Sequence, residues 1–384
     1  MIYVKIKKFQ AKNVRSFKEE INIELSNFNV FIGENSSGKS NLISLIRTAI
    51  QSGIGTIENI PPYDDRFPEQ SNFSCLIKFD KGDIDEISSE EEFNRLVSES
   101  AALPPQGTAI FKNDIDLFGL QSTLEFSSSW SREGNSTVRQ SFPALTNLLL
   151  PRQNAPQTFI IQNQINFIKR FYSIVNQQFL RKSIFVSDTR NLLIQFPMGV
   201  TNPQNPIDAG SILTYVSRWM LNDRPTYDSF MAHVKRLLPR LADLQVEPSG
   251  NTASLFVKEN GLMHLFSGNE LSKGSKEILV VLGALALAKK SSIIFIEEPE
   301  IHLHPYALKE LKSIMLDAVK ERGVQIVIST HHPWFLEDLI PETDKSVKVF
   351  KFENKNQAGN FVNEIRTDAE ISELIDKLKF NNGH

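Results

Sequence analysis

One short segment, GENSSGKS at residues 33–40, restricts the possible folds of this chain more than any other. It fits the pattern G-x-x-x-x-G-K-[ST], in which the backbone curls around phosphate oxygens and presents successive N–H groups. The preceding run EINIELSNFNVFIG is typical of a strand, and residues 40–51 carry apolar side chains at helical spacing. Strand, glycine-rich loop and helix follow in the order that the motif needs. The segment therefore predicts an α/β fold with a phosphate-binding loop.

The loop supplies most of the candidate ligand-binding residues. Lys39 is expected to neutralise the β- and γ-phosphates of ATP, and the Ser40 hydroxyl to ligate Mg²⁺. The other candidates lie in the loop or at its edge: Gly33, Asn35, Ser36, Ser37, Gly38 and Asn41. We therefore predict ATP and Mg²⁺ as the bound groups. The alternative is an ordinary helix N-terminus.

A second motif, IIFIEEPEIHLHP, occupies residues 293–305. Its apolar residues predict a buried strand, and two carboxylates follow at the C-terminal end, where α/β sheets bind ligands. Glu297 is predicted to hold Mg²⁺, directly or through water, and Glu298 to polarise the attacking water as a catalytic residue. The alternative is a pair of surface carboxylates on a turn.

A third motif, VQIVISTHHPWFLEDL, covers residues 324–339. Another apolar strand ends at two histidines. His331 is the predicted catalytic sensor, contacting the γ-phosphate or carrying a hydrogen bond that reports the bound nucleotide. A purely structural histidine is the alternative, and His332 is the weaker candidate.

A fourth motif, ELSKGSKEILVVLGALALA, covers residues 270–288. Ser272 and Gly274 stand at the start of a very apolar helix, which is an anion-binding arrangement. Leu-Ser-x-Gly is common by itself, but here it precedes the carboxylate strand.

Composition and charge exclude several other classes. The net charge of −3 gives no global basic field for nucleic acid, and Cys75 is the single cysteine, which favours a reducing compartment. The N-terminal residues lack the apolar core of a signal peptide. The apolar run at 278–288 is shorter than the ~20 residues of a membrane span. We therefore expect a cytoplasmic protein without a membrane partner.

The remaining pattern predicts a helix at 158–182, helices near 209–221 and 226–241, and a hairpin within ASLFVKENGLMHLF. After residue 270, helices and strands alternate, which predicts a parallel sheet. The basic side chains of the first helix are expected to form a solvated face or, alternatively, a surface for nucleic acid or a partner: Lys169, Arg170, Arg181 and Lys182.

In this order the four motifs resemble an ATP-binding-cassette (ABC) type of ATPase, in the soluble branch with RecF, the SMC proteins and the OLD family. NVRSFKEEINIELSNFNVFIGENSSGKSNLISLI resembles the N-terminal signature of that branch, and EEPEIHLHP with STHHP resembles the OLD-like group. The resemblance implies an α/β, ABC-type P-loop NTPase: a mixed sheet with a parallel core, an antiparallel β-subsheet and a helical insertion or lobe. The segment 52–183 carries no such resemblance.

The expected domain organisation follows from this fold. The ATPase core is expected in two halves, at 1–60 and 255–350. Between them lie a β-rich and irregular insertion at 61–157 and a helical lobe at 158–254. A C-terminal tail with a docking helix follows at 351–384.

The resemblance also implies a composite site. Two subunits would dimerise around ATP, with Ser272 and Gly274 of one touching the γ-phosphate bound to the other. His304 would lie at that interface, and Arg15 beside the nucleotide. Glu297 replaces the usual Asp, as OLD-like proteins often show. LSKGS in place of LSGGQ argues against a transporter subunit, and no glutamine loop is identified.

Three functions remain open from the sequence. The first is an ATP-hydrolysing, OLD-like sensor or scaffold for a separate effector such as a nuclease or toxin, as in bacterial anti-phage defence. Its basis is that the residues after STHHP are too few for the Toprim nuclease that follows in OLD nucleases. The alternative is a RecF-like DNA-repair ATPase that binds DNA through the basic residues at 169–182 and 235–240 and loads other proteins on it. A nucleotide-binding scaffold without hydrolysis would fit the same motifs.

Overall fold

The computed structural model describes the following parts of the chain: residues 5–52, 72–78, 123–130, 136–141, 183–187, 195–197, 207–208, 212–249, 252–289, 292–339, 344–354 and 359–381. The chain divides into two compact units. The first comprises Met1–Leu25, Asn41–Leu180 and Asn354–Phe361, and the second comprises Ser26–Ser40, Arg181–Glu353 and Val362–His384. Each unit is described by itself.

The first unit contains a five-stranded antiparallel sheet in the order β2-β1-β4-β5-β6. Its strands are β1 (Lys5–Lys12), β2 (Ile21–Glu24), β4 (Asn72–Lys78), β5 (Thr123–Trp130) and β6 (Ser136–Ser141). Alternation explains β1 from Lys8 onward, because Phe9 and Ala11 are buried while Lys8 and Lys12 lie on or near the surface. An irregularity in the pairing with β4 between Ile6 and Lys8 shifts this pattern, so Ile6 is buried as well.

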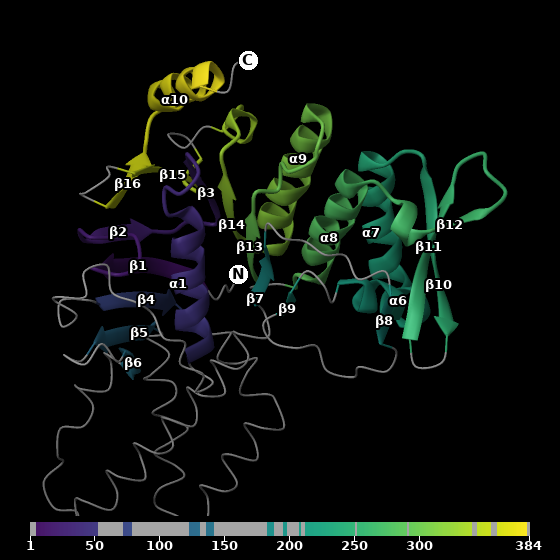
Figure 1. Ribbon diagram of the computed structural model, residues 1–384, viewed down its shortest axis with the longest axis horizontal. Coiled ribbons are helices and arrows are strands. Elements are labelled where there is room, and N and C mark those ends of the chain that lie inside the picture. Colours follow the sequence, from purple (N-terminus) through teal and green to yellow (C-terminus); the bar gives the residue numbers. More distant parts are fainter. Residues whose placement is uncertain are drawn as a thin grey trace, which may run out of the picture. The chain divides into compact units, whose positions relative to one another are not determined.

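The second unit is built on a seven-stranded sheet in the order β16-β15-β3-β14-β13-β7-β9 (Figure 1). The strands are β16 (Asn360–Ile365), β15 (Val347–Asn354), β3 (Phe28–Gly33), β14 (Gln325–Thr330), β13 (Ile293–Glu297), β7 (Ser183–Val186) and β9 (Ile207–Asp208). From β15 to β9 every pairing is parallel. The strands β3, β14 and β7 are buried along their whole length, which explains their continuous apolar sequences.

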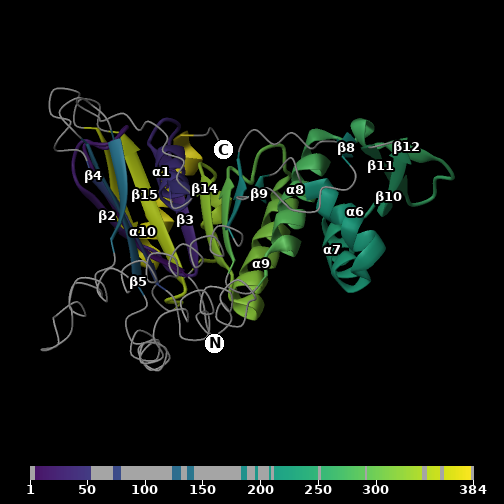
Figure 2. The same cartoon turned by 90° about the horizontal axis from the view of Figure 1, so that it is seen from below.

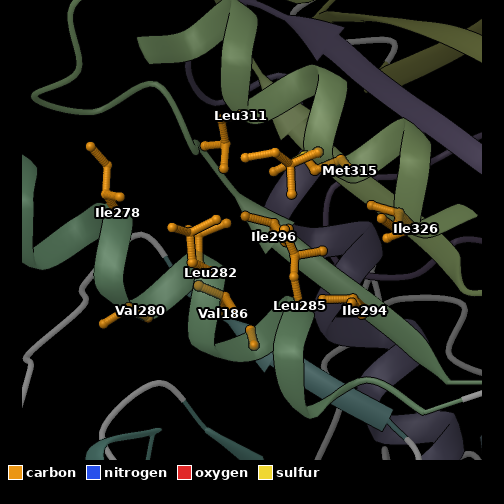
Figure 3. Close-up of a cluster of buried hydrophobic side chains, with 14 of the residues drawn as sticks. Val186, Ile278, Val280, Leu282, Leu285, Ile294, Ile296, Leu311, Met315 and Ile326 are labelled. Atoms are coloured by element: carbon orange, nitrogen blue, oxygen red, sulfur yellow. The ribbon is translucent and has the colours of Figure 1, made fainter. Parts of the chain in front are cut away.

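Two long helices, α8 (Lys273–Leu287) and α9 (Pro305–Arg322), contact β13 and β14 respectively. Figures 1 and 2 show them between these strands and the pair α6 (Ile212–Asn222) and α7 (Arg224–Leu237). In Figure 3, Leu282 and Leu285 of α8 lie close to Ile296 of β13 and Met315 of α9. Each fully buried side chain of this size contributes about 1.5–3 kcal/mol. This packing holds β13 and β14, whose C-terminal ends carry the candidate site residues.

A smaller antiparallel sheet completes the second unit, with the order β10-β11-β12 and β8 paired to β11. Its strands are β8 (Gln195–Pro197), β10 (Leu241–Ser249), β11 (Thr252–Glu259) and β12 (Leu265–Ser267). The hairpin expected at ASLFVKENGLMHLF is confirmed as β11–β12, with Gly261 at φ 81° in its turn.

For the helix expected at 226–241, the predicted C-terminal end is wrong. Helix α7 stops at Leu237, and β10 begins at Leu241. Pro239 explains the stop, since proline disfavours helical backbone at the residue before it. The tail expected from 351 contains the end of β15 and the whole of β16 before its helix, α10 (Asp368–Asn381).

The expected fold class is confirmed: a mixed sheet with a parallel core, an antiparallel sheet and helices. The helix expected near 209–221 is also confirmed, as α6. The helix expected at 158–182 lies outside the described residues, as do its basic side chains. The expected domain boundaries stay a prediction.

Candidate active site

The phosphate loop joins β3 to helix α1 (Lys39–Ser52). A Cβ added to Gly33 would lie 2.3 Å from the carbonyl oxygen of Phe352 on the adjacent strand β15, so only glycine fits there. Ser36 and Gly38 adopt positive φ values of 62° and 99°. Such backbone turns successive N–H groups toward one side, as an anion-binding loop requires.

The Lys39 ammonium lies inside the curl of this loop. Its Nζ donates to the carbonyl oxygens of Gly33 and Glu34 at 2.7 and 2.8 Å, and it lies 3.5 Å from Ser37 Oγ. The residue is only 5% exposed. Burial lowers the pKa of Lys39, while the charges of Glu298, Glu300 and Glu34 act in the opposite direction. A positive charge is thus held at the loop, with three carboxylates near enough to influence it.

The two predicted carboxylates lie at the C-terminal end of β13. Glu297 is the last residue of the strand, paired in register with Ser329 of β14. Glu298 follows, and its N–H donates to Ser329 O at 2.7 Å. Its φ of 45° is unusual for a residue other than glycine, and such strain is often kept at functional sites. Both side chains are partly exposed.

Glu300 is a site residue that the sequence did not indicate. Its Oε1 accepts hydrogen bonds from Thr330 Oγ1 at 2.6 Å and from the His331 N–H at 3.0 Å. Burial raises the pKa of Glu300, and these hydrogen bonds oppose that shift. The only available signal was a third acidic residue in EEPE, two positions after Glu298.

The predicted sensor His331 lies directly beyond β14 and joins the same cluster. Its Nδ1 is 3.3 Å from Glu300 Oε1 and 3.9 Å from Glu298 Oε1, and its side chain is 38% exposed. The neighbouring His332 has a local role, because its Nδ1 accepts from the Trp334 N–H at 3.4 Å. His331 is therefore the histidine that lies beside the carboxylates of Glu298 and Glu300, and its role as sensor stays a prediction.

The segment LSKGS forms the start of α8. Ser272 caps this helix, with its Oγ accepting from the Ser275 N–H at 3.1 Å. A Cβ on Gly274 would lie 2.5 Å from the carbonyl oxygen of His302, so this glycine allows α8 to approach the turn after β13. His304, at the end of that turn, is exposed and caps α9 through the Tyr306 N–H. These contacts give Ser272, Gly274 and His304 each a structural role within one subunit.

Two further candidates lie in the first unit. Arg15 is in a tight turn closed by reciprocal hydrogen bonds between Val14 and Phe17, and its φ is 51°. Asn41 donates to Ser16 Oγ in the same turn at 2.9 Å. The structure thus joins Asn41 to the NVRSF segment, and the nucleotide contacts of both residues stay a prediction.

The residues present fit a nucleotide with Mg²⁺. Gly33 and Gly38 leave the loop backbone open, Lys39 supplies a buried positive charge, and Ser40 is exposed at the start of α1. Within the described ranges, no three or more His, Cys, Asp or Glu side chains are grouped to hold a metal. Mg²⁺ does not need such a group, because it commonly takes one or two protein carboxylates together with phosphate oxygens and water.

The sheet order and the phosphate loop are those of an ABC-type P-loop ATPase fold. A head domain of an SMC protein, bound to the C-winged helix domain of ScpA, is 12% identical with a TM-score of 0.53, over 96% of this chain and 99% of that one. SMC head domains from Pyrococcus furiosus and Pyrococcus yayanosii are 11% and 10% identical. Each has a TM-score of 0.50 and covers 99% of this chain and 100% of its own. At these identities the similarity concerns the fold alone.

A family profile described as "AAA domain, putative AbiEii toxin, Type IV TA system" matches residues 28–337. This match spans well over half of the chain, and the protein belongs to that family. Among curated proteins none matches the sequence. In the part of the chain that the structure describes, no helix combines the length and apolar character needed to cross a membrane.

Proposed function

We propose that the protein binds and hydrolyses ATP. The observation that carries this proposal is that a buried lysine, a glutamate and a histidine gather at one end of a parallel sheet. Lys39 lies in the phosphate loop after β3, while Glu298 and His331 follow the adjacent strands β13 and β14. Ligands of open α/β sheets bind at this edge.

Each residue has a role that its position permits. Lys39 would exchange its contacts with the Gly33 and Glu34 carbonyl oxygens for phosphate oxygens of ATP. Mg²⁺, held by Ser40 and Glu297, would offset charge on the phosphates. Glu298 would accept a proton from the attacking water, and His331 would contact the γ-phosphate or carry a hydrogen bond that reports the bound nucleotide.

The loop assignment is tested by Lys39→Ala, compared with Lys309→Ala as a control. Lys309 is an exposed residue of α9 whose Nζ lies 3.7 Å from Asp338. Loss of a charge-assisted contact with phosphate costs about 1.5–3 kcal/mol, so the Kd for ATP should rise at least tenfold in Lys39→Ala. Titration with a fluorescent ATP analogue should show no change for Lys309→Ala. Equal affinity of Lys39→Ala and the wild type would refute the assignment.

We also propose that ATP favours a head-to-head dimer in which Ser272 and Gly274 reach the partner's nucleotide. The N-terminus of α8 is a suitable anion-binding element, and the Gly274 contact ties it to the turn after β13. Light scattering of Glu298→Gln should give twice the monomer mass with ATP and the monomer mass without it. A monomer under both conditions would reject the composite site.

For the biological role, we propose an ATP-dependent sensor or scaffold of the OLD-like group that controls a separate effector. The family description, which names a toxin and a type IV toxin–antitoxin system, supports such a role. EEPEIHLHP with STHHP supports the OLD-like branch. The test is isolation of the native protein with its partners, with and without ATP. A toxic enzyme or nuclease retained only in one nucleotide state is expected, and its absence from both would count against the role.

The DNA-repair alternative has no specific support among the described residues. Of the basic side chains near 235–240, Arg236 is engaged by Glu310 of α9. We therefore retain the effector-controlling ATPase.

A further inference from the structure

Glu300 connects the two turns that carry the candidate catalytic groups. It lies in the turn after β13, and its side chain is 5% exposed. The donors to its Oε1, Thr330 Oγ1 and the His331 N–H, belong to the end of β14 and the turn that follows. One buried carboxylate oxygen therefore ties residues thirty positions apart in the sequence.

The network continues beyond Glu300 itself. The Thr330 hydroxyl donates to Glu300 and accepts from the His332 N–H at 3.0 Å. The backbone on both sides of His331 is thus held, directly by Glu300 and indirectly through Thr330. This leaves the imidazole as the part of the turn that still needs orientation.

The imidazole of His331 lies beside the same oxygen. The 3.3 Å between Nδ1 and Glu300 Oε1 is a close approach without the geometry of a hydrogen bond. The carboxylate of Glu298 lies farther from Nδ1, at 3.9 Å. When Glu300 is ionised, its Oε1 favours a proton on Nδ1 of His331, because the group beside a ring nitrogen decides which of the two nitrogens carries the proton.

A purely structural role would not require a carboxylate. A neutral amide oxygen also accepts two hydrogen bonds, and a buried negative charge has a large desolvation cost. In addition, Glu300 Oε2 is buried and has no hydrogen-bond partner within the described residues. Unsatisfied buried acceptors are rare in proteins and often accompany function.

We propose that Glu300 is a positioning residue: its carboxylate fixes the turn at Thr330–His331 and keeps a proton on Nδ1 of His331, which orients the imidazole toward the nucleotide. Its effect on turnover rests on the proposed ATP hydrolysis. Its effect on the ring of His331 does not, because it exists in the protein without nucleotide.

The first test is therefore spectroscopic. In protein with ¹⁵N-labelled histidine, the ring signals of His331 are assigned by their absence in His331→Gln. The wild type should show a protonated Nδ1, and Glu300→Gln should lose this signature. Thr330→Val is the matched control, because it removes the two hydrogen bonds of the hydroxyl, to Glu300 and from the His332 N–H, and leaves the carboxylate beside the ring. It should keep the Nδ1 proton.

The second test separates binding from turnover. Glu300→Gln should change the KM for ATP by less than threefold and lower kcat at least tenfold, while Thr330→Val should retain most of the turnover at a lower melting temperature. If Glu300→Gln does not fold, Glu300→Asp answers the same question, since its carboxylate is withdrawn by one methylene.

Unchanged ring signals in Glu300→Gln, or equal ring signals and equal kcat in Glu300→Gln and Thr330→Val, would overturn the proposal. Absence of ATP hydrolysis by the wild type would instead reject the proposed function. The ring signals would still decide whether Glu300 positions His331.

Discussion

Replacement of Gly33 by alanine tests the close packing that shapes the phosphate loop. Gly33 is paired in register with Phe352 of β15, and the added Cβ would lie 2.3 Å from the Phe352 carbonyl oxygen and 2.9 Å from Ser37 Oγ. The first neighbour is backbone in a sheet and has little freedom to move. Strands β3 and β15 must therefore separate locally, or the loop must shift.

The expected cost follows from these contacts. Forced overpacking costs about 1–3 kcal/mol, and a lost ladder hydrogen bond about 1 kcal/mol. A total of about 2–4 kcal/mol corresponds to a fall of about 4–16 °C in Tm for a unit of this size. Because Ser37 lies in the loop, the Kd for ATP should also rise at least tenfold.

Thermal unfolding and titration with a fluorescent ATP analogue measure the two effects. Gly261→Ala is the control: no atom lies within 4 Å of its added Cβ, but its φ of 81° disfavours alanine. It should lose about 1 kcal/mol of stability and keep the ATP affinity of the wild type. If Gly33→Ala matched the wild type in both Tm and Kd, the reasoning about β15 and the loop would be refuted.

Two further predictions concern stability. Burial, with Arg236 and Arg322 nearby, lowers the pKa of His233 below 6.5, so the unfolded state takes up this proton first as the pH falls. Below about pH 6.5, the Tm of the wild type should therefore fall more steeply with pH than the Tm of His233→Gln, while above about pH 7.5 the two plots of Tm against pH should run parallel. Plots that run parallel over the whole pH range would contradict this. The Lys312 ammonium donates to the Glu337 carbonyl oxygen and is buried, so Lys312→Met should cost about 1–3 kcal/mol in urea unfolding. Lys379→Met, which removes only an exposed ion pair with the Glu337 carboxylate, should cost less than about 1 kcal/mol, and equal losses would argue against the buried contact.

The parts of the site that are local in sequence were predictable. The loop between β3 and α1 has a motif whose residue spacing follows from its geometry, and the predicted loop lies where expected. The apolar runs that end at Glu297 and Thr330 were likewise predicted as buried strands, and parallel pairing brings their ends to the same edge. Regular alternation and short-range spacing were enough for these elements.

The parts that depend on long-range contacts were not predictable. Glu300 receives its role from Thr330 and the His331 N–H, and no local pattern marks that pairing. The strand β10 was missed because helical spacing was followed through Pro239, although the chain there turns into a hairpin with β11. A strand pairing of this kind depends on its partner more than on its own sequence.

The hydrolytic role of Glu298 is the central claim, and one substitution tests it most directly. Glu298→Gln keeps the size of the side chain and removes the carboxylate that would accept a proton from water. Measured side by side with Mg²⁺, the variant should bind ATP with a Kd within threefold of the wild type and hydrolyse it at least a hundredfold more slowly. Hydrolysis by Glu298→Gln at the wild-type rate would contradict the assignment of this site.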